Sequence, residues 1–140
     1  MRRLKRFAGL SWQEQSLLLR AAALVGLIRM GLWLLPFSLV LRFASAKIRT
    51  STGLHSVEQL VWAVKSASRC LPGSTCLTQA LAARLLLAQF GYGSRVEIGV
   101  AKDEEGRFEA HAWLAVGEQV VIGGPQTNRY TSLLGWDATR

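Results

Sequence analysis

The spacing of apolar and polar positions divides the chain into a helical first part and a strand-rich last part. Apolar residues recur at helical spacing after Ser11, which with Glu14 has the signature of a capping box. The recurring positions are Leu17, Leu18, Ala21, Leu24, Val25 and Ile28. We therefore predict a helix here, followed by a second helix that begins near Pro36, a residue suited to a first helical turn.

Two further helices are predicted in the middle of the chain. Ser56 and Gln59 have capping-box spacing and begin a helix that runs to about residue 68. A loop with a Pro-Gly turn follows, and its last residues, Ser74 and Thr75, can cap the next helix. That helix covers residues 76–90 and is ended by glycine.

The last part of the chain predicts strands. Residues 95–101 and 108–116 alternate between apolar and polar positions, with a hairpin turn between them, and residues 119–122 form a third short strand. The chain contains no internal repeat and no low-complexity linker. Helices followed by an antiparallel meander indicate the α+β class, with N-terminal helices packed on a small antiparallel sheet. A chain of 140 residues suits one compact domain.

Positive charge is concentrated in residues 1–50, which we interpret as a basic, amphipathic helical segment that precedes a second region over 51–140. The first 49 residues hold nine Lys and Arg against one acid, Glu14, whereas the remainder is balanced. A compact nucleic-acid-binding domain would spread its charge over the fold, so that class is disfavoured. The charge leaves open a peripheral contact with an anionic surface or with an acidic partner.

The apolar stretch over residues 21–41 is about long enough to cross a bilayer. Arg29 lies at its middle and Pro36 interrupts it, and an arginine at the centre of a bilayer costs roughly 2.5–3.5 kcal/mol on insertion scales. A secretory signal is disfavoured because Arg20 and Arg29 break the apolar region and no small-residue cleavage site follows cleanly. We therefore favour a soluble domain.

Cys76 is the first candidate for chemistry because it lies in the first turn of a predicted helix. The helix N-terminus favours a thiolate, and its unpaired N–H groups could hold an oxyanion. The alternative is a small apolar residue packed under a loop.

His111 is the second candidate. Strand alternation places it on one face with Glu109 and Trp113, and Phe108, Ala110, Ala112 and Leu114 on the other. A histidine near a cysteine can accept the thiol proton and later donate it to a leaving amine. The alternative is a core histidine bonded to a backbone carbonyl. Trp113 could line a substrate cleft or belong to the core.

A metal site would use the same residue types. Cys70, Cys76, His55 and His111 could supply four ligands, but the spacing of five residues between the cysteines departs from structural zinc patterns. We therefore expect no metal and no cofactor.

The run from CLTQALA to VVIGG resembles the lasso-peptide maturation proteases, a transglutaminase-like family. It is similar to the stand-alone form of the C-terminal domain of the microcin-processing protein. The resemblance lies in the CL-x-x-AL-A helix, the IGV strand, the F-x-AHAW strand and the closing VVIGG, after an N-terminal helix pair ending near LLPF. It implies a transglutaminase- or papain-like cysteine-peptidase fold, with a transglutaminase-like catalytic region over 51–140. It also implies a cytoplasmic enzyme, with membrane association left open.

The resemblance also implies roles for individual residues. Cys76 would be the nucleophile and His111 the general base and acid. Family members carry an aspartate about a dozen residues after the histidine, where this chain reads VVIGGPQTN. Asn128, Gln126 or the more distant Asp137 could orient the imidazole instead, or a backbone carbonyl could do so, and we expect slow turnover.

The implied function is removal of the leader from a ribosomally made lasso-peptide precursor, so that a partner cyclase can close the macrolactam. The implied partners are the precursor's leader, a separate leader-binding protein and the lasso cyclase, with no nucleic acid. Two alternatives stay open: an acyltransferase or transglutaminase-type reaction on the same fold, and a non-catalytic interaction protein at a membrane surface.

Overall fold

The computed structural model of the protein describes most of the chain between Lys5 and Asp137. The described residues are 5–6, 8–36, 39, 42, 55–71, 75–102 and 104–123, together with the backbone of 131–137. The predicted helix near Pro36 falls largely outside these residues, so the structure does not test it.

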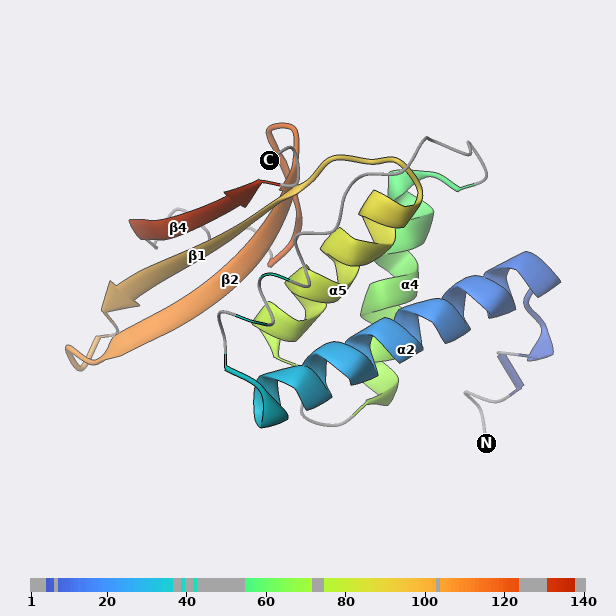
Figure 1. Ribbon diagram of the computed structural model, residues 1–140, viewed down its shortest axis with the longest axis horizontal. Coiled ribbons are helices and arrows are strands. Elements are labelled where there is room, and N and C mark those ends of the chain that lie inside the picture. Colours follow the sequence, from blue (N-terminus) through green and yellow to red (C-terminus); the bar gives the residue numbers. More distant parts are fainter. Residues whose placement is uncertain are drawn as a thin grey trace.

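Three helices precede a four-stranded sheet, which confirms the α+β class (Figure 1). The helices are α2 (Trp12–Leu34), α4 (Val57–Cys70) and α5 (Cys76–Gln89). The strands are β1 (Arg95–Lys102), β2 (Phe108–Val116), β3 (Gln119–Ile122) and β4 (Thr131–Asp137).

The sheet differs from the predicted three-stranded meander because it contains a fourth strand. Its order is β3-β2-β1-β4, and each neighbouring pair is antiparallel. The chain therefore returns after β3 to the far edge of β1. The sequence TSLLGWD of β4 lacks regular alternation and contains Gly135. Its strand conformation comes from backbone pairing with β1, and the local sequence pattern does not predict this pairing.

Three of the predicted helix starts are confirmed. Ser11 with Glu14 and Ser56 with Gln59 each form a complete capping box, in which side chain and backbone bond in both directions. Thr75 caps α5 by accepting a hydrogen bond from the Thr78 backbone N–H. Each cap satisfies a donor that the first helical turn leaves unpaired, so local sequence alone defines these three starts.

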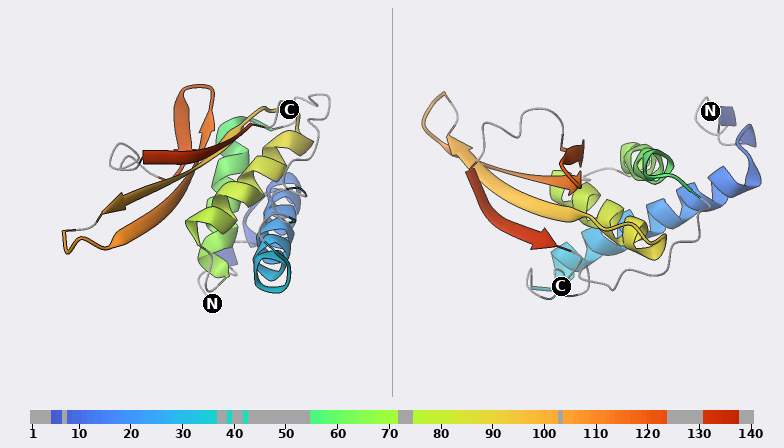
Figure 2. Two further views of the ribbon diagram at one scale, coloured as in Figure 1. Left: turned by 60° about the vertical axis from the view of Figure 1, so that its left-hand side comes forward. Right: turned by 90° about the horizontal axis from the view of Figure 1, so that it is seen from above.

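The core lies between the helices and one face of the sheet. In Figure 2, α5 lies between the sheet on one side and α2 on the other, and it packs against α2, α4 and strands β1 to β3. Nine of its 14 residues are buried, and the predicted stripe of α2 joins the same core. The buried members of that stripe are Leu17, Ala21, Val25 and Ile28.

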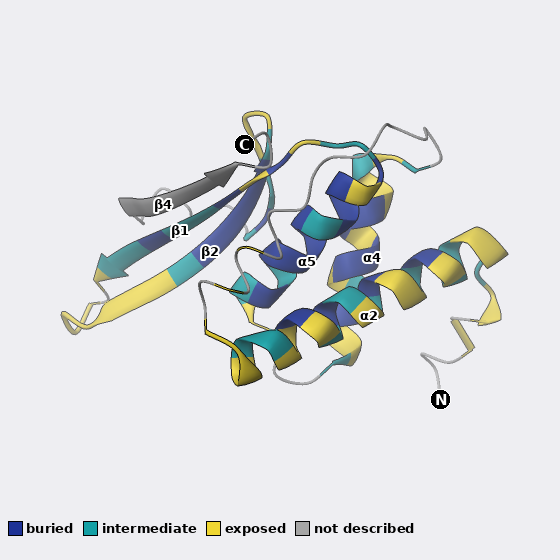
Figure 3. Ribbon diagram, viewed as in Figure 1, coloured by how far each residue is buried: buried dark blue, intermediate teal, exposed yellow. Residues whose placement is uncertain are grey.

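The opposite side of α2 is exposed (Figure 3). By length and composition α2 could cross a membrane, yet only 22% of its most apolar stretch is buried inside the protein. α2 therefore differs from the mostly buried core helix of a globular protein, because its outer side faces solvent.

Candidate active site

Cys76 is the first residue of α5 and is half-buried, without a disulfide partner. The hydroxyls of Thr75 and Thr78 lie 3.0 Å apart beside it, and Thr75 holds the first turn through its cap. Cys70, at the end of α4, is exposed and also unbridged. Of the two thiols, only Cys76 combines partial burial with a helix N-terminus, where the peptide dipoles favour a negative charge.

His111 is half-buried on β2, and its ring has a defined hydrogen bond. Its Nε2 lies 2.8 Å from the carbonyl oxygen of Gly123. A carbonyl can only accept, so Nε2 carries the hydrogen of this bond, and in the neutral ring Nδ1 carries the lone pair. The imidazole is thereby held in the tautomer in which Nδ1 can act as a base.

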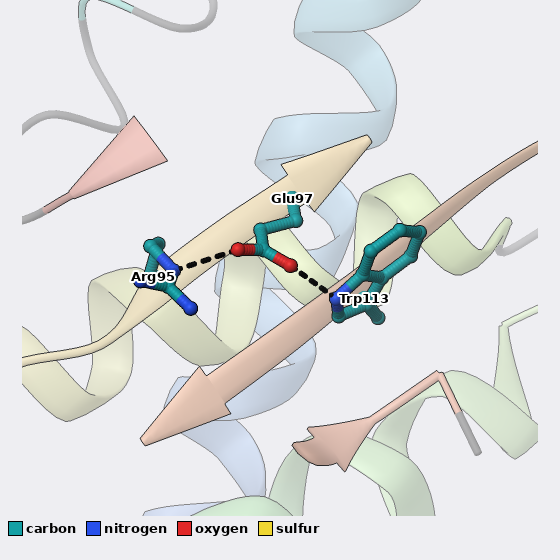
Figure 4. Close-up of polar contacts among 3 residues, drawn as sticks. All are labelled: Arg95, Glu97 and Trp113. Carbon is teal, nitrogen blue, oxygen red and sulfur yellow. Dashed lines mark hydrogen bonds and ion pairs between the residues drawn. The ribbon is translucent and has the colours of Figure 1, made fainter. Parts of the chain in front are cut away.

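Trp113 supports the imidazole from the same strand. The His111 and Trp113 rings are stacked, with centroids 6.4 Å apart and planes inclined by 28°. The indole Nε1–H donates to Glu97 Oε2 at 2.7 Å, and the other oxygen of Glu97 pairs with Arg95 Nε at 2.8 Å (Figure 4). Trp113 is 5% exposed, so it belongs to the buried support of the site and does not line an open cleft.

Gly123 brings its carbonyl to His111 because it packs directly onto β2. Its φ is +110°, a conformation that side chains rarely adopt. A Cβ at this position would lie 2.4 Å from Trp113 Cβ and 2.9 Å from Trp113 Cα. Only glycine allows this approach, so the His111 hydrogen bond depends on the absence of a side chain at position 123.

The structure brings α5 against β2 but does not bond the thiol to the imidazole. Leu114 packs in the core with the helices, and alternation along β2 turns His111 and Trp113 to the opposite face, as predicted. Among the described residues, no hydrogen bond joins Cys76 to His111. The face of β2 that holds His111 is therefore turned away from the helix that carries Cys76, and the structure does not bring the two candidate residues together.

The candidates for a third member divide into two groups. Asn128 and Gln126 lie outside the described residues. The backbone of Asp137 pairs with Arg95, whereas His111 pairs with Gly99, four residues further along β1. This separation is roughly 13 Å along the strand direction. The backbone carbonyl at Gly123 is the orienting group that the described residues provide.

The described residues contain no candidate metal centre, and one hollow of the molecule lies away from Cys76 and His111. Within the described ranges, no three His, Cys, Asp or Glu side chains are grouped closely enough to hold a metal ion. A hollow of about 520 Å³ lies between α4 and β3, lined by Trp62, Lys65 and Arg69 among others, and neither Cys76 nor His111 lines it. The hollow is therefore distinct from the candidate catalytic residues.

Sequence reasoning missed three contributors to this region. Gly123 could have been suspected from the paired glycines that end β3, which favour positive φ. Glu97 gave no signal, because a glutamate in an alternating strand normally faces water. Arg84 is 1% exposed within α5, where the apolar run AARLLLA conceals a buried cation. A buried charge must be compensated by its surroundings, and Arg84 is part of the buried side of α5.

Comparison with protein families gives one match, to the model of the transglutaminase-like superfamily, over residues 17–135. Searches of curated proteins and of solved structures gave no match. The matched region contains Cys76, His111 and the whole of α4 and α5. Since the match covers most of the chain and agrees with the observed order of helices and strands, the protein belongs to the transglutaminase-like superfamily.

Proposed function

We propose that the protein is a cysteine peptidase that removes the leader from a ribosomally made lasso-peptide precursor. Superfamily membership suggests a cysteine-dependent amidase or peptidase activity. The observation that carries the proposal is the family match over residues 17–135, because the matched region contains both Cys76 and His111. The hydrogen bond from His111 Nε2 to the Gly123 carbonyl is compatible with a base at Nδ1, and a core histidine would make the same bond. The choice of substrate rests on the resemblance of the CL-x-x-AL-A, AHAW and VVIGG motifs to the lasso-peptide maturation proteases.

The proposed reaction proceeds in two steps. His111 Nδ1 accepts the thiol proton of Cys76, and the sulfur attacks the carbonyl carbon of the scissile peptide bond. The imidazolium then donates its proton to the leaving amine, which departs with the new N-terminus and leaves a thioester on Cys76. Water, deprotonated by His111, hydrolyses the thioester and restores the thiol. The products are a leader ending in a carboxylate and a core peptide with a free amine.

The Gly123 carbonyl replaces the carboxylate that family members place beside the histidine. A neutral carbonyl orients the ring as a carboxylate does, but it stabilises the imidazolium less because it carries only a partial charge. We therefore expect slow turnover. The proposed reaction also requires a rearrangement when the substrate binds, because His111 lies on the face of β2 that is turned away from α5 and its thiol.

The proposal includes the partners that such a reaction needs. The substrate is the leader of the precursor peptide, presented by a separate leader-binding protein, and the product is consumed by a lasso cyclase. We propose that leader removal and cyclisation take place in the cytoplasm. An amine in place of water as the acceptor would give the alternative acyl-transfer reaction, which differs only in the second step.

A mass-spectrometric cleavage assay on the cognate precursor, with the leader-binding protein present, tests the proposal. We expect the native chain to release intact leader, and Cys76→Ala to abolish release. Cys70→Ala is the matched control and should leave release unchanged, since this thiol is exposed at the end of α4. Release that survives Cys76→Ala would overturn the proposal, and an amine adduct of the leader would identify acyl transfer.

Gly123→Ala tests the orienting role of the backbone carbonyl. The added Cβ would collide with Trp113 and move the carbonyl away from His111. We expect a fall in kcat of about tenfold to a hundredfold, because the imidazole loses the group that orients it. Gly117→Ala is the control, since Gly117 also has positive φ but a Cβ there meets open space. Equal effects of the two substitutions on kcat would refute the orienting role.

A further inference from the structure

The outer side of α2 forms a mostly apolar face that is exposed to solvent and is interrupted by the exposed Ser16. At helical spacing its members lie on one side of the helix, opposite the stripe that packs into the core. These residues, called here the outer face of α2, are Trp12, Leu19, Ala23, Leu27, Met30 and Leu34. Figure 3 shows exposed positions recurring along the whole helix. The face is about 34 Å long, from 23 residues at 1.5 Å each.

A helix that is apolar on all sides is normally buried in a protein interior or in lipid. α2 is buried on one side only, where it packs against α4 and α5. Its other side exposes large side chains to water, among them Leu27 at 65% and Met30 at 59%. Such an extended apolar surface marks an interaction site.

The charges around the outer face indicate what it contacts. Arg20 and Arg29 are exposed on its two flanks, and Lys5 and Arg6 are exposed just before the helix. Glu14 is the one acidic residue among the first 49, and the Ser11 capping box engages its carboxylate. An apolar face bordered by cations is complementary to the surface of an anionic bilayer, where acyl chains lie beneath negative headgroups.

The two tryptophans support a membrane surface. Trp12 and Trp33 lie near opposite ends of α2 and are 83% and 85% exposed. Indole rings favour the boundary between headgroups and acyl chains, because one edge is polar and the rest apolar. A protein partner would have to offer a groove as long as the helix, whereas a bilayer accepts a protruding helix anywhere on its surface.

We propose that α2 lies flat on an anionic phospholipid bilayer, with its outer face inserted among the headgroups. Crossing the bilayer would require the buried stripe, including Leu17 and Val25, to leave the core of the domain. Lying in the plane keeps that stripe packed and immerses only the outer face. This inference is independent of the proposed peptidase activity, since it uses none of the candidate catalytic residues.

Vesicle flotation tests the proposal. The full chain should float with vesicles containing about 30% phosphatidylglycerol and bind phosphatidylcholine vesicles weakly. The double variant Leu27→Gln/Met30→Gln should lower the partition coefficient at least about tenfold, because two inserted apolar side chains are lost. Phe108→Gln is the control, since Phe108 is 76% exposed but lies on β2. It should bind as the native chain does.

Two further measurements separate the apolar and charged contributions. Lys5→Gln/Arg6→Gln should reduce binding, with the deficit largest at low salt, because salt screens the attraction that these cations provide. Trp12→Phe/Trp33→Phe should remove most of the blue shift in tryptophan emission that vesicles induce. Unfolding curves of all variants should match the native curve, because the substituted side chains are exposed.

Three results would overturn the proposal. The first is no flotation with anionic vesicles, and the second is equal flotation with phosphatidylcholine alone. The third is native flotation by Leu27→Gln/Met30→Gln. Concentration-dependent dimerisation that this variant abolishes, in a chain that does not float, would assign the outer face to a second copy of the chain instead.

Discussion

Helices α2 and α5 both carry apolar residues on more than one side, yet the protein buries them differently. Nine of the 14 residues of α5 are buried, against four of the 23 in α2. α5 occupies the central layer, with α2 and α4 on one side and the sheet on the other, whereas α2 has packing partners on one side only (Figure 2). Apolar composition therefore indicates that a helix has side chains to bury. Its position in the layers determines how many of them the neighbouring elements bury.

The largest expected difference between the two helices is in the response to truncation of a leucine. Leu81 of α5 is fully buried in the core, and Leu81→Ala should lower the free energy of unfolding by about 2–5 kcal/mol, since it leaves a cavity. Leu27→Ala on the outer face of α2 should change it by less than about 0.5 kcal/mol. Urea unfolding followed by circular dichroism measures both.

A similar loss of unfolding free energy in Leu81→Ala and Leu27→Ala would contradict this expectation. It would mean that the outer face of α2 is buried against another molecule in solution. Concentration dependence of the unfolding midpoint would then identify self-association as the cover.

The helix caps should produce a smaller effect, similar in the two helices. Thr75→Ala and Ser11→Ala each leave a backbone N–H of the first turn without its side-chain acceptor. Each should lower the free energy of unfolding by about 1 kcal/mol. Thr75→Ser retains the hydroxyl and should restore most of the loss at α5. A loss confined to α5 would show that the start of α2 contributes nothing to global stability.

The smallest expected effect is a pH dependence in the capping box of α2. The backbone N–H and the hydroxyl of Ser11 donate to the Glu14 carboxylate and hold its pKa below the ordinary value of 4.5. A lowered folded-state pKa means that the stabilisation is present at neutral pH and is lost as pH falls through that pKa. Glu14→Gln should therefore flatten the dependence of stability on pH below about pH 4.5.

Thermal unfolding of Glu14→Gln and the native chain, compared between about pH 6 and pH 3, measures this contribution. Ser56 and Gln59 form the equivalent box at α4 without a titratable group, so Gln59→Ala should cost the same at every pH. An unchanged pH profile in Glu14→Gln would show that the carboxylate does not contribute to the cap.

Local sequence was sufficient for the elements that carry their own signals. The Ser11 and Ser56 capping boxes, the Thr75 cap and the alternation along β1 and β2 each act within a few residues, so each could be recognised before any tertiary contact was known. β4 carries no such signal. Its conformation depends on pairing with β1, more than 30 residues away in the chain, and the sequence-based meander of three strands was incomplete.

The candidate site divides in the same way. Cys76 and His111 could be selected because residue type and local position point to their chemistry: a thiol at a helix start and a polar ring in an apolar strand. The Gly123 carbonyl could not be selected, because every residue has a carbonyl and only the fold determines which one meets the imidazole. Its closeness to Trp113 requires glycine, a reason visible only once β2 and the end of β3 are packed.

The sequence by itself determined where the helices begin, which stripe of α2 faces inward and which side chains could perform cysteine chemistry. These properties follow from hydrogen bonds and side-chain periodicity within one or two turns of chain. Tertiary structure alone decided that β4 joins β1, that Gly123 orients His111 and that the outer face of α2 stays uncovered. Those outcomes depend on which distant segments share a layer, because burial and pairing are properties of neighbours in space.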